Sequence, residues 1–499
     1  MFHVYLCTST VDATRTLLAS TSRTKKTFPL LGNLLDMPSG YEWFTFLKWC
    51  NEYESDIIYL KVLGTSMIVL NTYETSIEFL ESRSSIYSGR PWSTMVNDLM
   101  GWKFNFGFNQ YGMEHNCNTI RQKLIFEKET NGQRNLLNDH ICGNFETYFL
   151  PVIDSADLFK PPSVKAARDM LQRCIDEPDD ILAKLRHMSS QSIISIAYGL
   201  EVASKDDPYI GIAERAVVPL AFAGAPGAFM VDLAKKWNAY RVEMLGKPFA
   251  AAKEAISQEN KAGQNTAIDE QSIKEIAGVM YTGGADTTVS AIASCILALL
   301  DHPEVLRKAQ QELDNVLGSS RLPEFSDMDS LPYSTAVVKE TMRWRPVAPL
   351  NLPHQLLADD EYRGYRFPAG SIVIENAWAM LHDENVYPDP LCFKPERFIK
   401  DGKWDSSVRD PLKICFGAGR RICPARFMAF PSVWITVVSM MAAFDIRKSV
   451  DELGNIIEPD RNFISSLVCT PNYIACKIKP RSKEAEALIR ASAAVSDFQ

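Results

Sequence analysis

The longest helical pattern in this 499-residue chain runs from about Asp269 to Leu300. At 1.5 Å per residue, an unbroken helix of this length measures about 45–50 Å. Two neighbouring glycines, Gly283 and Gly284, lie in its middle, and each costs about 1 kcal/mol relative to alanine in a helix. A bulky flat ligand lying against the helix would offset that cost; the alternative is a notch of small residues where two helices cross. The fold must accommodate one long helix that has two adjacent glycines at its centre.

The remaining patterns predict more helix than strand. Two strands, residues 56–63 and 66–70, are joined at Gly64 into a hairpin, and short strands follow within 350–375 and after residue 444. The hydrophobic period indicates helices in these segments: 43–53, 74–83, at least two within 164–200, 302–317, 333–344 and 425–444. We therefore predict a mainly α fold with a minor β region, an α+β domain dominated by helices.

Composition narrows the class of protein. Hydrophobic residues make up 46% of the chain and charged residues 23%, which excludes a disordered protein. A net charge of −8 without a basic stripe argues against nucleic-acid binding. Eleven scattered cysteines without a Cys-x-x-Cys pair argue against a disulfide scaffold or a zinc ribbon. The apolar stretch 429–444 is short for a membrane span and predicts a buried helix, and residues 1–26 form a tail without a visible membrane anchor.

The sharpest local motif is Phe-Gly-Ala-Gly-Arg-Arg-Ile-Cys-Pro-Ala-Arg, residues 416–426. Its glycines permit close backbone approach and positive φ. Arg420 and Arg421 precede Cys423, so we expect their charge to lower the pKa of the thiol. Pro424 suits the first position of a helix, which would put Cys423 at a helix N-terminus. A thiolate backed by arginine is what a cysteine-ligated haem requires, although an isolated cysteine in such a place is more often a buried core residue.

The pattern Phe-x-x-Gly-x-Arg-x-Cys, carried by Phe416, Gly419, Arg421 and Cys423, resembles the haem-ligand signature of the cytochrome P450 family. The family usually has glycine two residues after the cysteine, where this chain has Ala425. The resemblance implies that Cys423 is the axial ligand of the haem iron, that Phe416 packs on the proximal face of the haem, and that Arg421 pairs with a propionate. It also implies the cytochrome P450 fold, a single large helical domain around haem b (Fe-protoporphyrin IX).

The middle of the long helix carries a second motif. Residues 283–288, Gly-Gly-Ala-Asp-Thr-Thr, resemble the oxygen-activation motif of the same family. The resemblance implies that Thr287 hydrogen-bonds dioxygen at the iron and that Asp286 helps to deliver protons.

Glu340 and Arg343 stand three residues apart on one face of their predicted helix. Taken alone, such a pair is usually a surface ion pair of little energetic value. In the family the pair is buried and joined by the arginine of a Pro-Glu-Arg-Phe segment, which here is Arg397. The resemblance implies a structural cluster that supports the cysteine loop.

Some positions depart from the family's pattern. Where the family usually has Trp-Arg to bind a haem propionate, this chain has His115 and Asn116, of which His115 could still donate a hydrogen bond. His354 occupies a place where relatives often carry a propionate partner. Residues 129–158 look longer than in relatives, and residues 231–247, where relatives form the lid of the access channel, look shorter.

Most substrate contacts implied by the resemblance are aromatic or aliphatic. They are Trp102, Phe104, Phe106, Ala285, Leu350, Phe463 and Leu467. A pocket with few charges suits a hydrophobic, polycyclic or aromatic molecule, although an aromatic stripe is also ordinary core.

The resemblance implies a monooxygenase that inserts one atom of O2 into a hydrophobic substrate and releases the other as water. Electrons would come from NADPH through a separate NADPH-cytochrome P450 reductase, which Lys413 and Arg420 could face unless they are simply solvated charges. Residues 31–38 and 87–91 look like fungal members, especially basidiomycete enzymes of secondary metabolism and xenobiotic oxidation. Residues 27–499 would form the haem domain. The family suggests the cytosolic face of the endoplasmic reticulum membrane; without a visible anchor, the cytoplasm is the alternative.

Three other interpretations stay open. A degraded or mis-spliced gene would give a haem-binding but catalytically impaired protein. A hydrolase with Cys423 as nucleophile would leave Gly283, Gly284 and the 416–423 motif unexplained. Within the monooxygenase class, desaturation or ring rearrangement could replace hydroxylation.

Overall fold

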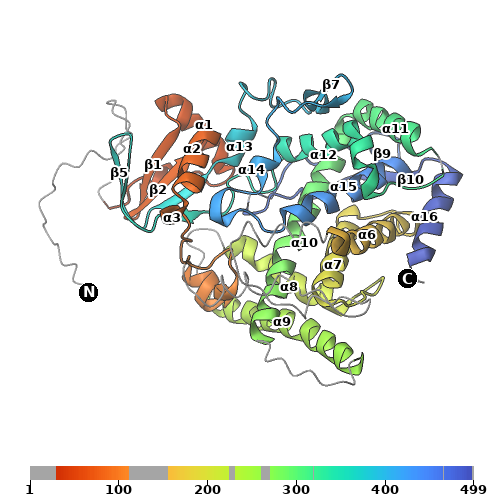
Figure 1. The fold of residues 1–499 in the computed structure, drawn as a ribbon, viewed down its shortest axis with the longest axis horizontal. Coiled ribbons are helices and arrows are strands. Elements are labelled where there is room, and N and C mark those ends of the chain that lie inside the picture. The colour runs from red at the N-terminus through yellow and green to blue at the C-terminus, as the bar shows by residue number, and fades with distance from the viewer. Residues whose placement is uncertain are drawn as a thin grey trace, which may run out of the picture.

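The computed structural model describes residues 30–111, 156–223, 231–259, 270–318, 320–464 and 466–496. The predicted site residue His115, its neighbour Asn116, the tail 1–26 and nearly all of the 129–158 segment lie outside these residues. Figure 1 shows a broad helical body with one group of strands at its left and a further pair at its right. The fold is mainly α with a minor β region, as predicted.

The helices follow the predicted patterns closely over the second half of the chain. They are α1 (Glu42–Tyr53), α2 (Tyr73–Ile77), α3 (Ser84–Tyr87), α6 (Ala156–Asp176), α7 (Ile181–Tyr198), α8 (Pro208–Ala223), α9 (Val231–Glu259), α10 (Glu270–Asp301), α11 (Pro303–Leu317), α12 (Pro332–Trp344), α13 (Ala377–Leu381), α14 (Leu412–Cys415), α15 (Arg426–Ala443) and α16 (Lys483–Ser496). The predicted 74–83 helix is α2 followed by a π-helical turn, η2 (Glu78–Ser82). Residues 231–247, for which no helix was predicted, form the first part of the long helix α9.

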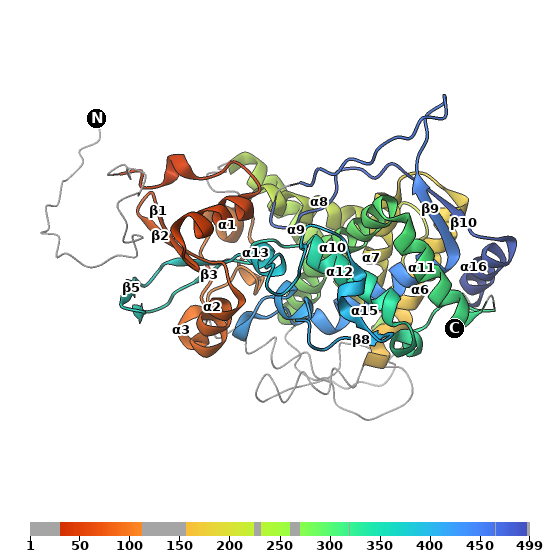
Figure 2. The same cartoon turned by 90° about the horizontal axis from the view of Figure 1, so that it is seen from above.

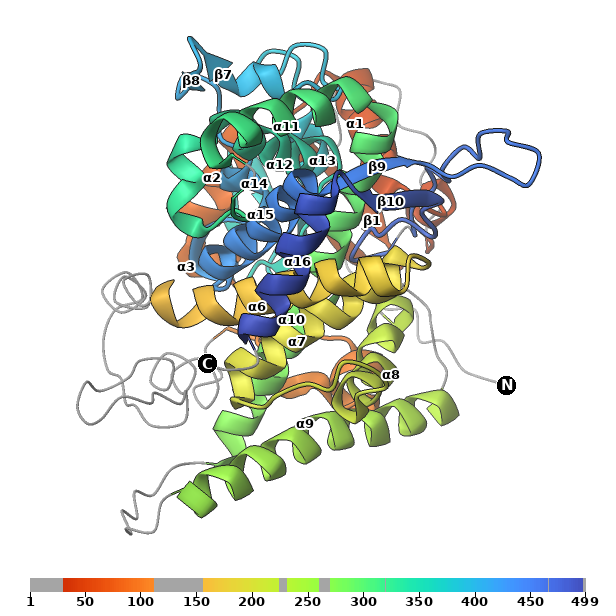
Figure 3. The same ribbon diagram turned by 90° about the vertical axis from the view of Figure 1, so that its right-hand side faces the viewer.

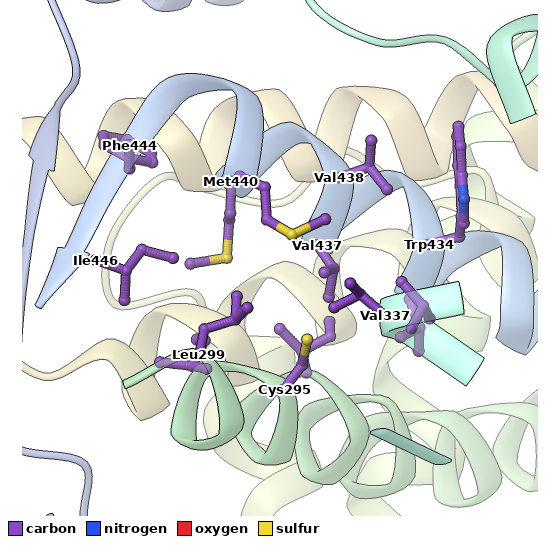
Figure 4. Close-up of a cluster of buried hydrophobic side chains, with 14 of the residues drawn as sticks. Cys295, Leu299, Val337, Trp434, Val437, Val438, Met440, Phe444 and Ile446 are labelled. Atoms are coloured by element: carbon purple, nitrogen blue, oxygen red, sulfur yellow. The ribbon is translucent and has the colours of Figure 1, made fainter. Parts of the chain in front are cut away.

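Helix α10 is unbroken, and it runs through the centre of the helical body (Figure 1). In Figure 4, Cys295 and Leu299 of α10 lie opposite Val437 and Met440 of α15. Helices α10 and α15 are both long and apolar enough to cross a membrane, but most of each is buried inside the protein. A helix that is apolar on all sides belongs in a core. The prediction that residues 429–444 form a buried helix is therefore confirmed.

The strands form one four-stranded sheet and three pairs. They are β1 (Ile57–Val62), β2 (Thr65–Leu70), β3 (His354–Gln355), β4 (Asp360–Tyr362), β5 (Tyr365–Phe367), β6 (Ile372–Glu375), β7 (Ile399–Lys400), β8 (Lys403–Trp404), β9 (Phe444–Lys448) and β10 (Cys476–Pro480). The sheet has the order β1-β2-β6-β3. The predicted hairpin is β1–β2, whose two turn residues, Leu63 and Gly64, both have positive φ, as a tight primed turn requires.

Strand β2 pairs in parallel with β6, far away in the sequence, and β6 pairs with β3 in the opposite direction. This arrangement carries His354 on β3 and Glu375 at the end of β6 to the side of the molecule that holds α2 and η2.

The connection between β9 and β10, residues 449–475, reaches out from the body as a long arm (Figures 2 and 3). Its base is tied to α10, because the hydroxyl group of Ser290 donates to the carbonyl oxygen of Cys469 at 2.5 Å. At the end of α10, Arg461 binds Asp301 through two hydrogen bonds of 2.9 and 2.8 Å. Contacts distant in sequence therefore hold the arm against the central helix.

Candidate active site

The cysteine loop, residues 416–423, joins α14 to α15 and closes on itself. The backbone N–H of Cys423 donates to the carbonyl oxygen of Phe416 at 2.8 Å. At the start of the loop, the N–H of Gly417 donates to the carbonyl oxygen of Ile414 at 3.1 Å. These two bonds fix the backbone around the cysteine sulfur.

Gly419 lies in the cysteine loop where the loop meets η2. Its φ of +63° lies in the left-handed region, and an added Cβ would lie 1.6 Å from the carbonyl oxygen of Leu80. Only glycine fits such a backbone-to-backbone contact. The loop is thus pressed directly against the segment that follows α2.

Burial raises the pKa of the Cys423 thiol, and the backbone N–H groups of Ala425 and Arg426 together with the charge of Arg426 oppose the rise. Helix α15 begins at Arg426, so Pro424 is not its first residue and the predicted position of the helix start was wrong. The amides that reach the sulfur still belong to the turn leading into the helix. Coordination to a metal ion would deprotonate such a thiol outright.

The two arginines before Cys423 make other contacts. Arg420 donates to the Tyr111 hydroxyl at 2.8 Å. Arg421 donates at 2.9 Å to each of three backbone carbonyl oxygens: those of Ser88, Phe106 and Asn109. The prediction that these arginines lower the pKa of the thiol was wrong, since the pKa is raised and Arg426 supplies the cationic contribution. Arg420 and Arg421 instead fasten the cysteine loop to residues 88–111.

Arg90 is a buried cation that was not predicted as a site residue. One guanidinium nitrogen donates to the carbonyl oxygens of Leu352 and Pro353 at 2.7 and 2.8 Å. Burial and the nearby charge of Arg421 lower the pKa of Arg90 to about 9. The sequence signal for it is slight, an arginine before a proline in a segment noted only for its likeness to fungal proteins.

His354 lies beside these arginines on β3 and is buried. Its Nδ1 lies 2.8 Å from the carbonyl oxygen of Tyr87 and must carry the hydrogen, because a carbonyl oxygen only accepts. Burial, followed by the charge of Arg90, lowers the pKa of His354 well below its usual range. The imidazole is therefore neutral next to two cations.

The cations Arg90 and Arg421, together with the neutral His354 beside them, form a cluster that fits an anionic ligand; we refer to these three residues as the cationic cluster. Within the described part of the chain, the Nε of Arg90 is buried without a hydrogen-bond partner, and so are Trp102 Nε1 and Asn109 Oδ1. Buried polar atoms are normally satisfied, so these groups point to a missing partner. A haem presents two carboxylates that N–H donors such as Arg90 Nε would bind, next to a cysteine that could hold its iron, whereas Asn109 Oδ1 can only accept a hydrogen bond. The residues present fit that group.

The two glycines of α10 have different surroundings. A Cβ on Gly284 would lie 2.3 Å from Ile193 Cδ1 of α7, so this glycine permits two helices to approach closely. A Cβ on Gly283 would meet nothing within 4 Å. Helix crossing thus explains Gly284, while Gly283 faces open space, as expected for a surface that receives a ligand. The Thr287 hydroxyl donates back to the Gly283 carbonyl oxygen at 2.7 Å.

Asp286 lies next to Thr287 and is half-buried. Burial raises the pKa of its carboxyl group, and the charge of Arg186 on α7 opposes the rise. The pKa of Glu214 on α8 is raised by burial and also by the charge of Asp286. Helices α7, α8 and α10 therefore meet around two acidic groups and one base.

Glu340, Arg343 and Arg397 form one buried cluster. Arg343 donates to both oxygens of Glu340 at 2.7 and 2.8 Å, and Arg397 Nε lies 3.1 Å from each of them. Arg343 also donates to the Leu381 carbonyl oxygen at 2.9 Å, which ties α12 to α13. A buried charge of this kind requires its partners, because removing one leaves an uncompensated ion.

The predicted substrate residues fall into two groups. Trp102, Phe104 and Phe106 pack in the same apolar cluster as Ala285 of α10, and the Trp102 and Phe104 rings stack at 5.6 Å. Leu350 and Phe463 belong to other clusters, packed against α1 and α13. Leu467 is half-buried in the arm between β9 and β10. The first group lies beside the motif of α10, whereas the second lies at the base of the arm.

Comparisons with known proteins agree with this geometry. A family profile described as Cytochrome P450 matches residues 234–476. The chain is similar to cytochrome P450 monooxygenase 98 of Postia placenta, with 41% identity over 93% of this chain and 91% of the relative. Tryptamine 4-monooxygenase of Psilocybe cyanescens is 36% identical over 91% of this chain and 92% of its own. A solved zebra fish cytochrome P450 with progesterone covers 88% of this chain and 99% of its own, with a TM-score of 0.70; at 22% identity that likeness concerns the fold alone.

Proposed function

The chain belongs to the cytochrome P450 monooxygenase family, and on this premise we propose that it is an active enzyme that binds haem b through Cys423 and oxidises a hydrophobic, aromatic or polycyclic molecule. The observation that carries the proposal is the buried cationic cluster beside the cysteine loop, in which Arg90 has an unpaired N–H. A buried N–H without an acceptor costs stability, so the free N–H of Arg90 is better satisfied when an anion is bound. The carboxylates of haem would supply that acceptor.

Several side chains of this protein would hold the cofactor. Cys423 supplies the sulfur ligand, with the N–H groups of Ala425 and Arg426 directed at it. Arg90, Arg421 and His354 receive the carboxylates, and an anion there would favour the protonated form of His354. We propose the same task for His115. Haem held in this way supplies the redox chemistry with O2, for which thiolate ligation provides electron density.

Thr287 and Asp286 would manage protons on the side of α10 that faces open space. The Thr287 hydroxyl donates a hydrogen bond to the Gly283 carbonyl oxygen and can turn to another acceptor when a ligand is present. Asp286, whose carboxyl pKa is raised by burial, holds a proton more readily than an exposed aspartate and can pass it toward the Thr287 oxygen.

The substrate class follows from the apolar cluster beside Ala285, where Trp102, Phe104 and Phe106 supply flat surfaces. Aromatic rings pack favourably on such surfaces. A relative named for tryptamine supports an aromatic substrate, and the Leu350, Phe463 and Leu467 group would line the far end of the pocket. We propose one hydroxylated product per O2 consumed.

Electrons would reach the site from a separate NADPH-cytochrome P450 reductase. Lys413 and Arg420 are exposed next to the cysteine loop and offer positive charge to an acidic partner. We propose that residues 27–499 act as one haem domain with residues 1–26 as a tail. We also propose that the protein works at the cytosolic face of the endoplasmic reticulum, where members of this family are typically attached.

The test is a reduced-plus-CO difference spectrum of the full-length chain, with Cys423→Ser as the control. We expect the red-shifted band of a thiolate-ligated haem in the natural sequence and its loss in the variant. A band at the shorter wavelength in both proteins, or the absence of haem, would contradict the proposal. Haem with the red-shifted band but no turnover of aromatic substrates would favour the catalytically impaired protein instead.

A further inference from the structure

We propose that Glu375 is a positioning residue for the cysteine loop: its buried carboxylate, acting through Asn351, fixes the carbonyl group of Ile414 from which the loop begins. This inference rests on the proposed function, since the position of the loop matters only if Cys423 is a ligand. Glu375 itself touches neither Cys423 nor the cationic cluster through a hydrogen bond among the described residues.

Glu375 ends strand β6 and is only 4% exposed. Its two carboxylate oxygens serve different elements. One accepts a hydrogen bond from the hydroxyl group of Ser76 on α2, and the other accepts from the side-chain amide of Asn351 at 2.6 Å. The backbone beside it pairs with Leu70 of β2. A carboxylate with both oxygens bonded inside the protein is held in one orientation.

Asn351 passes this orientation on. The same amide nitrogen that donates to Glu375 also lies 3.3 Å from the carbonyl oxygen of Ile414 in α14. The Asn351 backbone has a φ of +47°, and its N–H donates to the Ala348 carbonyl oxygen at 3.0 Å. Asn351 is thus fixed in a left-handed turn, and its side chain cannot follow the loop if the loop moves.

The Ile414 carbonyl oxygen links Asn351 to the cysteine loop. It accepts the Asn351 amide from one side and the Gly417 N–H, at 3.1 Å, from within the cysteine loop. A continuous set of hydrogen bonds therefore runs from Ser76 through Glu375 and Asn351 to the start of the loop.

The middle of the loop is held separately. Gly419 lies against the Leu80 carbonyl oxygen, and Leu80 belongs to η2, which directly continues α2. The start and the middle of the loop are therefore both connected to the α2–η2 segment, the start through Asn351, Glu375 and Ser76 and the middle through a backbone contact. Loss of the carboxylate would release the α14 end while the Gly419 contact remains.

Glu375 differs from an ordinary polar residue of the core because its charge acts on Arg90. Its charge acts on Arg90 with the opposite sign to that of Arg421. The carboxylate therefore offsets part of the positive charge of the cationic cluster while it positions the cysteine.

Glu375→Gln is the direct test. Glutamine offers one acceptor oxygen where the carboxylate offers two, so it cannot accept from both Ser76 and Asn351, and it also removes the negative charge that acts on Arg90. The control is Asp327→Asn, which removes a comparably buried carboxylate that binds Arg321 through two bonds of 2.6 Å in a different segment of the chain. The two variants are compared at temperatures equally far below their own Tm values.

Three readouts are taken on the holoprotein: transfer of haem to an apo-globin acceptor, the share of the red-shifted CO band, and hydrogen–deuterium exchange of a peptide spanning residues 412–423. We expect Glu375→Gln to lose haem about tenfold faster, in line with other changes behind a metal ligand. It should also lose part of the red-shifted band and exchange faster at 412–423. Asp327→Asn should match the natural sequence in all three.

Equal behaviour of Glu375→Gln and Asp327→Asn would overturn the inference, because a merely destabilised fold explains both. If the natural sequence lacks the red-shifted band, the proposed function fails, and the exchange of residues 412–423 alone decides the positioning role. If Glu375→Gln does not fold, Asn351→Gly replaces it, since glycine retains the positive φ and removes only the amide. Unchanged exchange in that variant would contradict the proposal.

Discussion

At the scale of single residues, two opposing effects act on the pKa of the Asp286 carboxyl group. Burial raises the pKa of its carboxyl group above that of the unfolded chain, against the charge of Arg186. The folded protein therefore binds this proton more tightly than the unfolded chain does. The resulting stability is complete below the unfolded pKa and is lost as the pH rises through the folded pKa. Above the folded pKa the ionised carboxylate destabilises the fold.

Asp286→Asn should therefore raise the free energy of unfolding at pH 7 by about 0.5–2 kcal/mol, the range common for such replacements. The gain should disappear near pH 4 and below, where the unfolded aspartate is also protonated. Turnover should fall by about 100-fold if Asp286 supplies protons. Urea unfolding at both pH values and product formation measure these effects.

Glu214→Gln is the matched control for Asp286→Asn. Burial also raises the pKa of the Glu214 carboxyl group, so the variant should gain stability at neutral pH without losing turnover. A gain for Asp286→Asn that is equally large at pH 4 would show that ionisation is not its cause.

The cysteine loop could be predicted from the sequence because its residues are neighbours along the chain. The contacts of its arginines could not, since Arg421 bonds to carbonyl groups more than 300 residues earlier. Arg90 was missed for the same reason, as its partners Leu352 and Pro353 come from a distant segment. Because Arg420 and Arg421 are close to Cys423 in sequence, we expected their charges to lower the pKa of its thiol. In the folded chain the cation that acts on this thiol is Arg426.

At the scale of elements, the glycine pair of α10 separates two tasks within a single helix turn. Gly284 allows α7 to pack closely, and its carbonyl oxygen accepts the Ser189 hydroxyl at 2.9 Å. A methyl group added at Gly283 would have no such neighbour within 4 Å. Glycine lowers helix stability at both positions. At Gly284 it is needed because α7 packs closely there, and at Gly283 it leaves the space that the proposed ligand would occupy.

Gly283→Ala should stabilise the haem-free protein by about 1 kcal/mol, because alanine is the better helix former and its methyl group meets no atom. In the haem-loaded protein the gain should shrink or reverse. Gly284→Ala, the control, should gain less in both forms because of Ile193. Urea unfolding of both forms measures this, and an equal gain for Gly283→Ala with and without haem would contradict a ligand on that face.

Most helix positions could be predicted from hydrophobic period, and α10, α11, α12 and α15 begin and end within two residues of the expected bounds. Helix α9 was not predicted. It continues through Gly246 and Pro248, residues that normally interrupt a helix, and tertiary packing overrides that local preference. The π-helical turn η2 depends on tertiary contacts in the same way.

At the scale of the whole molecule, the arm between β9 and β10 is held to α10 by charge. Burial tends to raise the pKa of Asp301, but hydrogen bonds and charges from Arg461 and Lys448 outweigh it and lower the pKa. The stability gained is therefore present above the unfolded pKa and lost as the pH falls through the folded pKa. Lys448 also contacts Glu458, so the base of the arm is a small charge network.

Asp301→Asn should lower the free energy of unfolding at pH 7 by about 1 kcal/mol, the upper range for partly exposed pairs. The difference from the natural sequence should fade as the pH falls through the folded pKa of Asp301, which lies below the unfolded value. Hydrogen–deuterium exchange within residues 456–469 should become faster, because the arm loses its contact with α10. Glu458→Gln, an exposed member of the network, is the control and should change exchange less.

The order of strands in the sheet could not be predicted, although the hairpin β1–β2 could. A tight turn at Gly64 leaves a local signal, whereas the parallel pairing of Met67 with Ile372 depends on chain that folds in between. The overall fold could be expected only through resemblance to a known family.

The parallel pairing of β2 with β6 also delays the completion of the sheet during biosynthesis. A ribosome adds about 5–20 residues per second, so β2 waits roughly 15–60 s after its own synthesis for β6 to emerge. Arg90 waits as long for the carbonyl groups that seat it. Nascent chains that end before Leu352 would thus lack the carbonyl groups that hold Arg90, so the proposed site for haem carboxylates could form only late in biosynthesis.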